Sequence, residues 1–132
     1  MRPDFLIRLK WGSGPWNHWR SENPDLAVSL DGAALDGMIL TGVNFSGVSL
    51  RRASLHATNL MNADLRGADF TNARLVEADL IGARLHGTIL TGANLRESGF
   101  NKSSSMPSVR DKLSLQEVDD LVGYLVTLKG LN

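Results

Sequence analysis

The 132-residue chain contains no cysteine, which excludes disulfide bonds, thiolate metal ligands, covalent haem attachment and cysteine nucleophiles. It has no excess of either charge, because 14 Lys and Arg balance 14 Asp and Glu, so a strongly basic nucleic-acid-binding surface is not expected. Long apolar runs are missing too, and with them the pattern of a membrane-spanning helix or a secretion signal. We therefore expect a soluble cytoplasmic protein with no direct nucleic-acid partner and no membrane partner.

A five-residue period organises residues 28–102. Every Leu and Phe in this range falls in one phase of the period, without a gap in fifteen pentads. Two residues before each of them stands a second column, which consists mainly of small residues. The large residues are Leu30, Leu35, Leu40, Phe45, Leu50, Leu55, Leu60, Leu65, Phe70, Leu75, Leu80, Leu85, Leu90, Leu95 and Phe100.

This period fits neither a helix nor a continuous strand. A helix turns by about 100° per residue, so a five-residue period makes no fixed stripe on it. In a continuous strand, an odd period would place successive Leu side chains on opposite faces. The chain must therefore turn once per pentad, with both columns pointing inward. Eight Gly occupy the position two after the large residue, where we expect a tight turn to use their conformational freedom.

Residues 63–67 (Ala-Asp-Leu-Arg-Gly) and 68–72 (Ala-Asp-Phe-Thr-Asn) resemble the A-(D/N)-L-x-x unit of the pentapeptide-repeat proteins. The resemblance covers residues 28–102, and residues 16–24 are similar to the lead-in of many bacterial members. It implies an all-β solenoid, a right-handed quadrilateral β-helix with four pentads per coil, hence nearly four coils in this chain. Such a rod exposes strand edges and apolar cross-sections at both ends, so we expect both ends to be covered.

Residues 1–27 are expected to form an N-terminal cap that contains a short helix. Pro15 suits the first turn of this helix. Trp16 and Trp19 lie three residues apart, on one helix face, where they can close over Leu30 and its coil. The alternative interpretation is that these aromatic side chains form an exposed binding patch.

Residues 103–112 are interpreted as a linker, and residues 113–132 as an amphipathic C-terminal α-helix that opens with a capping box. This helix is expected either to cap the solenoid or to pair with a second chain. Residues 105–130 also resemble the C-terminal end of class I cytochromes c, and that resemblance implies Met106 as a haem axial ligand. Because the Cys-x-x-Cys-His attachment site is absent, we expect no cofactor.

Catalysis is not expected either. The two inward columns should fill the interior and leave no cleft. On the outside, His56 and His86 are six pentads apart, on opposite sides of a four-sided coil, which excludes a shared metal site. Charged residues twenty positions apart should stack. The expected exposed ion pairs are Asp31 with Arg51 and Asp64 with Arg84.

One side of the solenoid is less polar than the others. Ile39, Met61 and Ile81 share this side, and Met61 and Ile81 stack at the same outward position. These three residues are the candidate interaction surface. The alternative interpretation is that single exposed apolar residues are normal in soluble proteins.

The sequence therefore favours a non-catalytic module for protein–protein interaction or scaffolding, with an unknown protein partner. A homodimer through an end coil or the C-terminal helix is one form this can take. A first alternative is a DNA-mimicking modulator of gyrase, a role of some pentapeptide-repeat proteins, although residues 28–102 hold seven acidic and seven basic side chains and so lack the charge of DNA. A second alternative is a haem-related role of the cytochrome-like tail.

Overall fold

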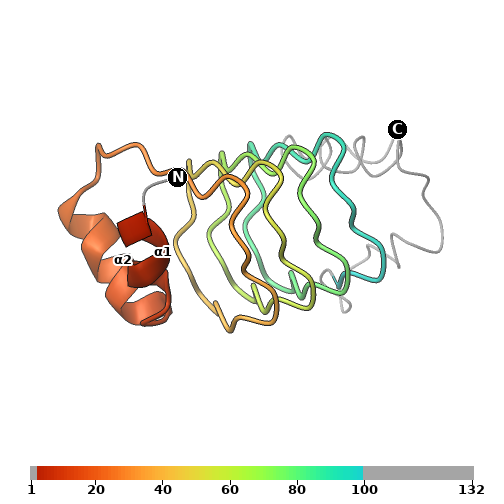
Figure 1. Ribbon diagram of the computed structural model, residues 1–132, viewed down its shortest axis with the longest axis horizontal. Helices are drawn as coiled ribbons and strands as arrows, with labels where there is room; N and C mark the ends of the chain where they lie inside the picture. The colour runs from red at the N-terminus through yellow and green to blue at the C-terminus, as the bar shows by residue number, and fades with distance from the viewer. Residues whose placement is uncertain (1–2, 100–132) are drawn as a thin grey trace.

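The computed structural model describes residues 3–99 of the chain. They form a rod of stacked coils with two helices at its N-terminal end (Figure 1). Helix α1 spans Pro3–Leu9 and helix α2 spans Ser13–Glu22. Neither of these helices is long and apolar enough to cross a membrane.

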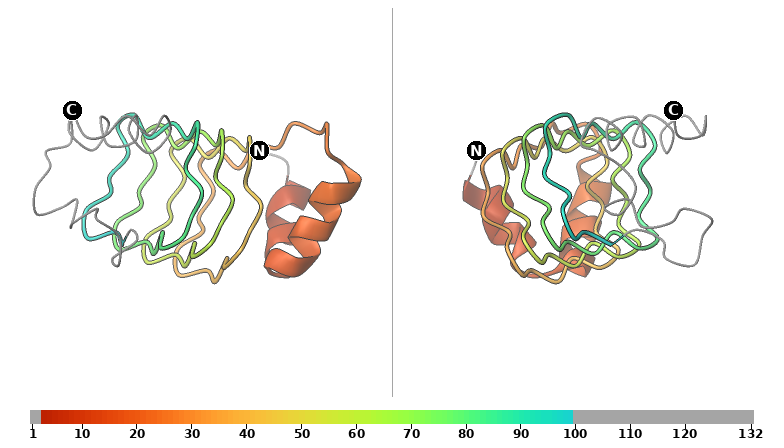
Figure 2. Two further views of the ribbon diagram at one scale, coloured as in Figure 1. Left: turned by 180° about the vertical axis from the view of Figure 1, so that it is seen from behind. Right: turned by 90° about the vertical axis from the view of Figure 1, so that its right-hand side faces the viewer.

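Parallel β-bridges join residues that are twenty positions apart, from Ser29 with Ser49 to Asp79 with Gly99. Each pentad contributes a single bridged residue, because the chain turns before a longer strand can form. Twenty residues hold four pentads, so each coil has four sides, and the end-on view shows the coils superposed around one axis (Figure 2). The β-solenoid expected from the five-residue period is confirmed.

Main-chain hydrogen bonds hold each coil to the next in a fixed register. The Leu30 and Gly32 amides donate to the carbonyl oxygens of Ser49 and Arg51 at 2.7 and 2.8 Å. In the opposite direction, the Ser49 amide donates to the Val28 carbonyl oxygen at 3.1 Å. This pattern recurs along the rod, so a side chain twenty residues later lies directly above its counterpart.

The two inward columns form one continuous core. The exposed fraction of the Leu and Phe side chains runs from 0% at Leu30 to 8% at Leu85. The second column packs beside them, with Met38 and Ala83 only partly buried. Two Thr in this column keep their hydroxyl groups satisfied.

The buried hydroxyl of Thr58 donates to the carbonyl oxygen of Leu35 at 2.8 Å. In the same way, the Thr88 hydroxyl donates to the Leu65 carbonyl oxygen at 2.6 Å. A buried hydroxyl without a partner would cost about 1–3 kcal/mol, so these bonds allow a polar residue to stand where most pentads have Ala.

The corner position, two residues after each Leu or Phe, has a positive φ angle in every pentad from residue 28 to 97. The eight Gly at corners have φ between 68° and 76°, as expected from the sequence. A side-chain hydrogen bond also stabilises the turn: the Oδ1 atom of Asn59, the residue before Leu60, accepts the Met61 amide hydrogen at 2.9 Å. The same bond is made by Asn44, Asp64, Asp69, Asp79 and Asn94. The Asp or Asn of the repeat is therefore a turn-closing residue.

Side chains of α2 replace the coil that is missing at the N-terminal edge of the rod. Asn17 Oδ1 accepts the Asn44 amide hydrogen at 2.7 Å, and Trp16 Nε1 donates to the Asn44 carbonyl oxygen at 2.8 Å. Arg20 donates to the Ser46 carbonyl oxygen at 2.5 Å. Within the rod, these are the main-chain groups that a preceding coil would bind. The helix therefore closes an exposed strand edge.

Trp16 is fully buried, and its ring packs edge-to-face at 5.8 Å on Phe45, which lies in the same coil as Leu30. The cap differs from the sequence-based expectation in having two helices where one was expected. Seven residues are too few for a helix to be stable alone. Helix α1 instead depends on tertiary contacts, such as that of the Phe5 ring with Trp19 at 5.6 Å, which leave no simple signal in the sequence.

Some expectations fall outside the described residues. These are the linker at 103–112, the helix at 113–132, the interpretation of Met106 as a haem ligand and the end of the expected solenoid at residues 100–102.

Candidate interaction surface

The four sides of the rod are numbered from the pentads of the first coil: 28–32 (first), 33–37 (second), 38–42 (third) and 43–47 (fourth), and each side repeats every twenty residues. The third side is formed by residues 38–42, 58–62 and 78–82. Met61 and Ile81 are in register on this side, because the Asn62 amide donates to the Ile81 carbonyl oxygen at 2.9 Å. Ile39 lies on the same side at the other outward position. It stacks with Asn59 through a β-bridge. The structure thus places the three predicted residues on one side, in two columns about 6.6 Å apart.

The three side chains differ in how far they project. Ile39 is 74% exposed, whereas Met61 and Ile81 are half-buried. Burying exposed apolar surface is the main favourable term in protein association. Ile39 therefore has the most to gain from a contact, and the other two extend an apolar strip along the rod.

Charge also sets the third side apart. Asp79 is its one charged residue among the described coils. The other three sides each carry at least three charged residues. Charged residues are depleted in the core of protein interfaces, so the third side is the side best suited to such a contact.

Ile39 occupies a position where Asn or Asp would serve the fold better. In the pentads with Asn or Asp here, the side chain accepts the amide hydrogen two residues later, as Asn59 does for Met61. With Ile at this position, the Thr41 amide has no acceptor among the described residues. The structure therefore shows no local stabilising role for the Ile39 side chain.

The second side carries a polar cluster of Asp36, Ser54 and His56. The Ser54 hydroxyl donates to Asp36 at 2.5 Å, and the main-chain amide of His56 donates to the same carboxylate at 3.0 Å. The His56 ring instead faces Glu77, with Nε2 to Oε2 at 3.3 Å. A nucleophilic serine needs its proton accepted by the imidazole ring. Here the proton goes to the carboxylate, so the cluster does not form a catalytic triad.

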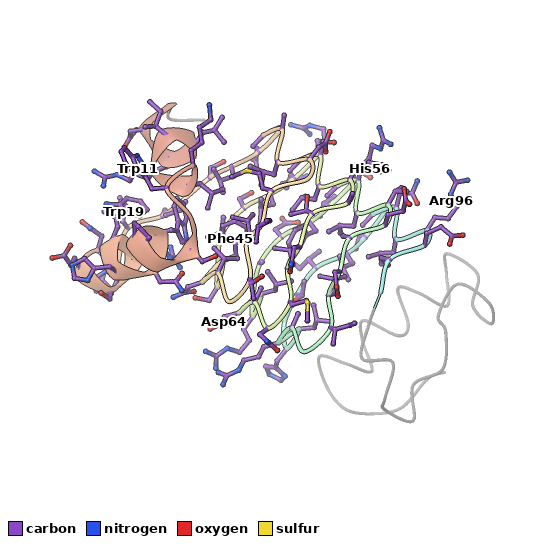
Figure 3. All side chains as sticks on the ribbon, turned by 90° about the horizontal axis from the view of Figure 1, so that it is seen from below. Trp11, Trp19, Phe45, His56, Asp64 and Arg96 are labelled. Carbon is purple, nitrogen blue, oxygen red and sulfur yellow. The ribbon has the colours of Figure 1, made fainter. Side chains whose placement is uncertain are left out.

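His56 and His86 lie on opposite sides of the rod, and Figure 3 shows His56 projecting on the side away from Asp64. Within residues 3–99, no three His, Cys, Asp or Glu side chains are grouped so that they could hold a metal ion.

Neither expected ion pair forms a direct contact, although Arg84 does interact electrostatically with Asp64. Asp31 accepts the Ser49 hydroxyl at 2.5 Å and the main-chain amide of Arg51 at 2.9 Å, so stacking brings it the amide and not the guanidinium. Asp64 pairs with Arg66, two residues later on the same side, at 2.7 and 2.8 Å.

These contacts also affect protonation. The hydrogen bonds from Arg66 lower the pKa of Asp64, and the Ser54 hydroxyl lowers the pKa of Asp36. Most acidic side chains of the coils therefore form hydrogen bonds or ion pairs within the fold.

Three further exposed apolar side chains were not predicted as candidates. They are Ile7, Trp11 and Ile89, exposed by 57%, 75% and 45%. Ile89 lies in the outward column of the first side, above Asp69, and the sequence marks it by the same departure from Asp or Asn that marks Ile39. Ile7 and Trp11 belong to the cap, where the period of the repeats gives no guide to orientation.

The model of the family "Pentapeptide repeats (8 copies)" matches this chain over residues 29–67 and 58–97. The chain is similar to the crystal structure of a pentapeptide repeat protein from the thylakoid lumen of Arabidopsis thaliana. The two sequences are 31% identical, the TM-score is 0.54, and the match covers 58% of this chain and 53% of that one. This chain therefore spans about half the length of that relative. No curated protein matches the chain.

Two proteins of the cyanobacterium Nostoc PCC 7120 are also similar. One pentapeptide repeat protein is 29% identical, with a TM-score of 0.37 and coverage of 66% of this chain and 74% of that one. HetL, involved in heterocyst differentiation regulation, is 31% identical, with a TM-score of 0.27 and coverage of 54% and 42%. The matched residues, 29–97, make up more than half of the chain and coincide with the stacked coils. The chain therefore belongs to the pentapeptide-repeat family.

Proposed function

We propose that this protein is a non-catalytic protein-binding module, and that the third side of the rod is its contact surface. The observation that carries the proposal is Ile39, which is 74% exposed at a position where Asn or Asp would close the turn. The filled core supports a role without a substrate cleft, because the inward Leu and Phe side chains between residues 28 and 97 are at most 8% exposed.

The small area of the third side determines how stable a contact it can make. Three coils extend roughly 14 Å along the rod at about 4.8 Å per coil, and a pentad extends roughly 13 Å across it. This area is far below the ~800 Å² that each partner contributes to a standard stable interface. We therefore expect a transient contact, of the kind that scaffolding and regulation use.

The test is crosslinking followed by affinity capture of the tagged protein from its native lysate. The key variant is Ile39→Asn, which removes the apolar side chain and supplies the turn-closing amide found at Asn59. Its matched control is Ile89→Asn, the same change at the same pentad position on the first side. A second variant, Met61→Asp with Ile81→Asp, makes the strip acidic.

A partner captured by the wild-type protein and by Ile89→Asn, but lost with Ile39→Asn and with the double variant, is the expected result. A partner retained by both third-side variants would show that the third side is not the contact surface. Self-crosslinks alone, unchanged in every variant, would indicate a self-associating rod that uses its ends.

A further inference from the structure

The tip of the N-terminal cap exposes two large apolar side chains. Trp11 is 75% exposed and Ile7 is 57% exposed, and they make up two of the four large apolar side chains that are exposed in residues 3–99. Trp11 lies at the helical end of the molecule (Figure 3), next to the Gly12 that leads into α2. By contrast, Trp16 is buried and Trp19 packs against the core.

This exposure does not arise because α1 lacks a place to bury its side chains. Phe5 and Leu9 of the same helix are 2% and 0% exposed. Ile7 and Trp11 lie four residues apart, and the Trp11 amide still donates to the Arg8 carbonyl oxygen at 3.3 Å, so the helical path continues to Trp11. Residues four apart in a helical path lie on the same flank. Ile7 and Trp11 therefore form one outward patch.

Positive charge surrounds this patch. Arg8 and Lys10 are both exposed between the two apolar residues in the sequence, and the Arg8 guanidinium also lies over the Trp19 ring, 4.8 Å from its centroid. Residues 1–27 carry four basic side chains and three acidic ones, a net charge of +1, and two of the basic side chains are Arg8 and Lys10 beside the patch. The patch therefore combines an aromatic ring, an aliphatic side chain and cations at one end of the rod.

The composition and size of the patch select its partner. A second copy of the chain would bring Arg8 and Lys10 close to their own counterparts, which opposes pairing. A protein partner would have to combine acidic groups with a groove shaped to fit these two side chains. A lipid surface needs no complementary shape: Trp is favoured at the headgroup level, and anionic lipids attract Lys and Arg.

We propose that the cap tip, consisting of Ile7, Arg8, Lys10 and Trp11, binds the surface of an anionic lipid bilayer. In this arrangement Trp11 and Ile7 enter the headgroup region, and the two cations contact lipid phosphate or carboxylate groups. The proposal departs from the expectation of no membrane partner. It is independent of the third side, so either contact can fail without the other.

The test is co-sedimentation of the purified full-length protein with vesicles of phosphatidylcholine, with and without phosphatidylserine. We expect binding to the phosphatidylserine vesicles that weakens with salt, because the Debye length shortens. Trp11→Ser should weaken binding at least about tenfold, which corresponds to about 1.4 kcal/mol. Ile39→Asn, which removes an equally exposed apolar side chain from the rod, should leave binding unchanged.

A second measurement shows that the tip itself enters the lipid. With phosphatidylserine vesicles, the wild-type Trp fluorescence should be shielded from acrylamide, because Trp11 is the most exposed of the three Trp. Trp11→Ser should unfold at the same urea concentration as wild type, since its side chain lies in solvent.

Absence of binding to anionic vesicles, or equal binding by wild type and Trp11→Ser, would overturn the proposal. So would self-association in analytical ultracentrifugation that is lost in Trp11→Ser, because the tip would then bind a second copy.

Discussion

The indole nitrogen of Trp16 donates a hydrogen bond of 2.8 Å to the carbonyl oxygen of Asn44, at the N-terminal edge of the rod. Asn17 binds the amide hydrogen of the same residue at 2.7 Å. Side chains of α2 therefore bind the two main-chain groups of Asn44, whereas Asp64 in the next coil binds the main chain of Val43 and Phe45 instead. The cap ends the solenoid by reproducing the hydrogen bonds of a coil with side chains of a helix.

Asn17→Ala should lower the free energy of unfolding by about 1–3 kcal/mol in urea titrations. The substitution leaves the partly buried amide of Asn44 without its acceptor and removes the exposed hydrogen bond to the carbonyl of Gly42. The control is His18→Ala on the same helix, whose side chain is 75% exposed, and its effect should stay within about 0.5 kcal/mol. Equal effects of the two substitutions would show that α2 does not close the edge.

Corner residues should respond to substitution according to their φ angle. Ala57 has φ of 57°, so Ala57→Gly should raise the free energy of unfolding by about 0.5–1 kcal/mol. The reverse change at Gly37, which has φ of 68° and open space around a new Cβ, should lower it by about 1 kcal/mol.

Gly82→Ala should cost more than Gly37→Ala, because its Cβ would overlap the side-chain oxygen of Asn62 in the coil below. Thermal unfolding followed by circular dichroism ranks the three variants. A stabilising Gly37→Ala, or equal costs at Gly37 and Gly82, would be inconsistent with these corner conformations.

Leu65→Asp should abolish cooperative unfolding, because it places an unpaired charge in a core position that is 1% exposed. The neighbouring Arg66 points outward and pairs with Asp64 at the surface. Arg66→Ala should therefore leave the melting curve close to that of the wild type. Circular dichroism melting curves distinguish the two, and a cooperative transition in Leu65→Asp would disprove the inward assignment.

Stability should fall in acid. The hydroxyl of Ser54 lowers the pKa of Asp36, and Arg66 lowers the pKa of Asp64. A carboxyl group whose pKa is lower in the folded state stabilises the fold above the ordinary carboxyl value of about 3.9. This contribution is lost as the pH falls through the folded-state value. Urea unfolding should show a decline below about pH 4, and Ser54→Ala should make that decline shallower. An identical pH profile in Ser54→Ala would contradict the role of its hydroxyl.

The core was predictable because its cause is local and repeated. Each pentad from 28 to 97 must place its large residue inward and turn at the corner, and fourteen repetitions of the rule leave one arrangement. The same regularity placed Ile39, Met61 and Ile81 on one side, since register fixes which residues stack.

Contacts that depend on side-chain reach were not predictable. Stacking placed Arg51 above Asp31, but whether its amide or its guanidinium would meet the carboxylate depends on geometry within the pentad. Where Asn or Asp precedes the large residue, it closes its own turn. Ser49 and Ser54 do not, and the carboxylates of the previous coil bind the amides instead. The docking of α2 on Asn44 is likewise a tertiary fit without periodicity.

The most direct test of the third side as a protein-binding surface is site-specific photo-crosslinking in living cells. A photoreactive residue is introduced at Thr41, exposed on the third side, or at Thr91, exposed at the same pentad position on the first side. The account predicts a discrete crosslinked partner from Thr41 and none from Thr91. Crosslinks of equal yield from both positions, or from Thr91 alone, would contradict it.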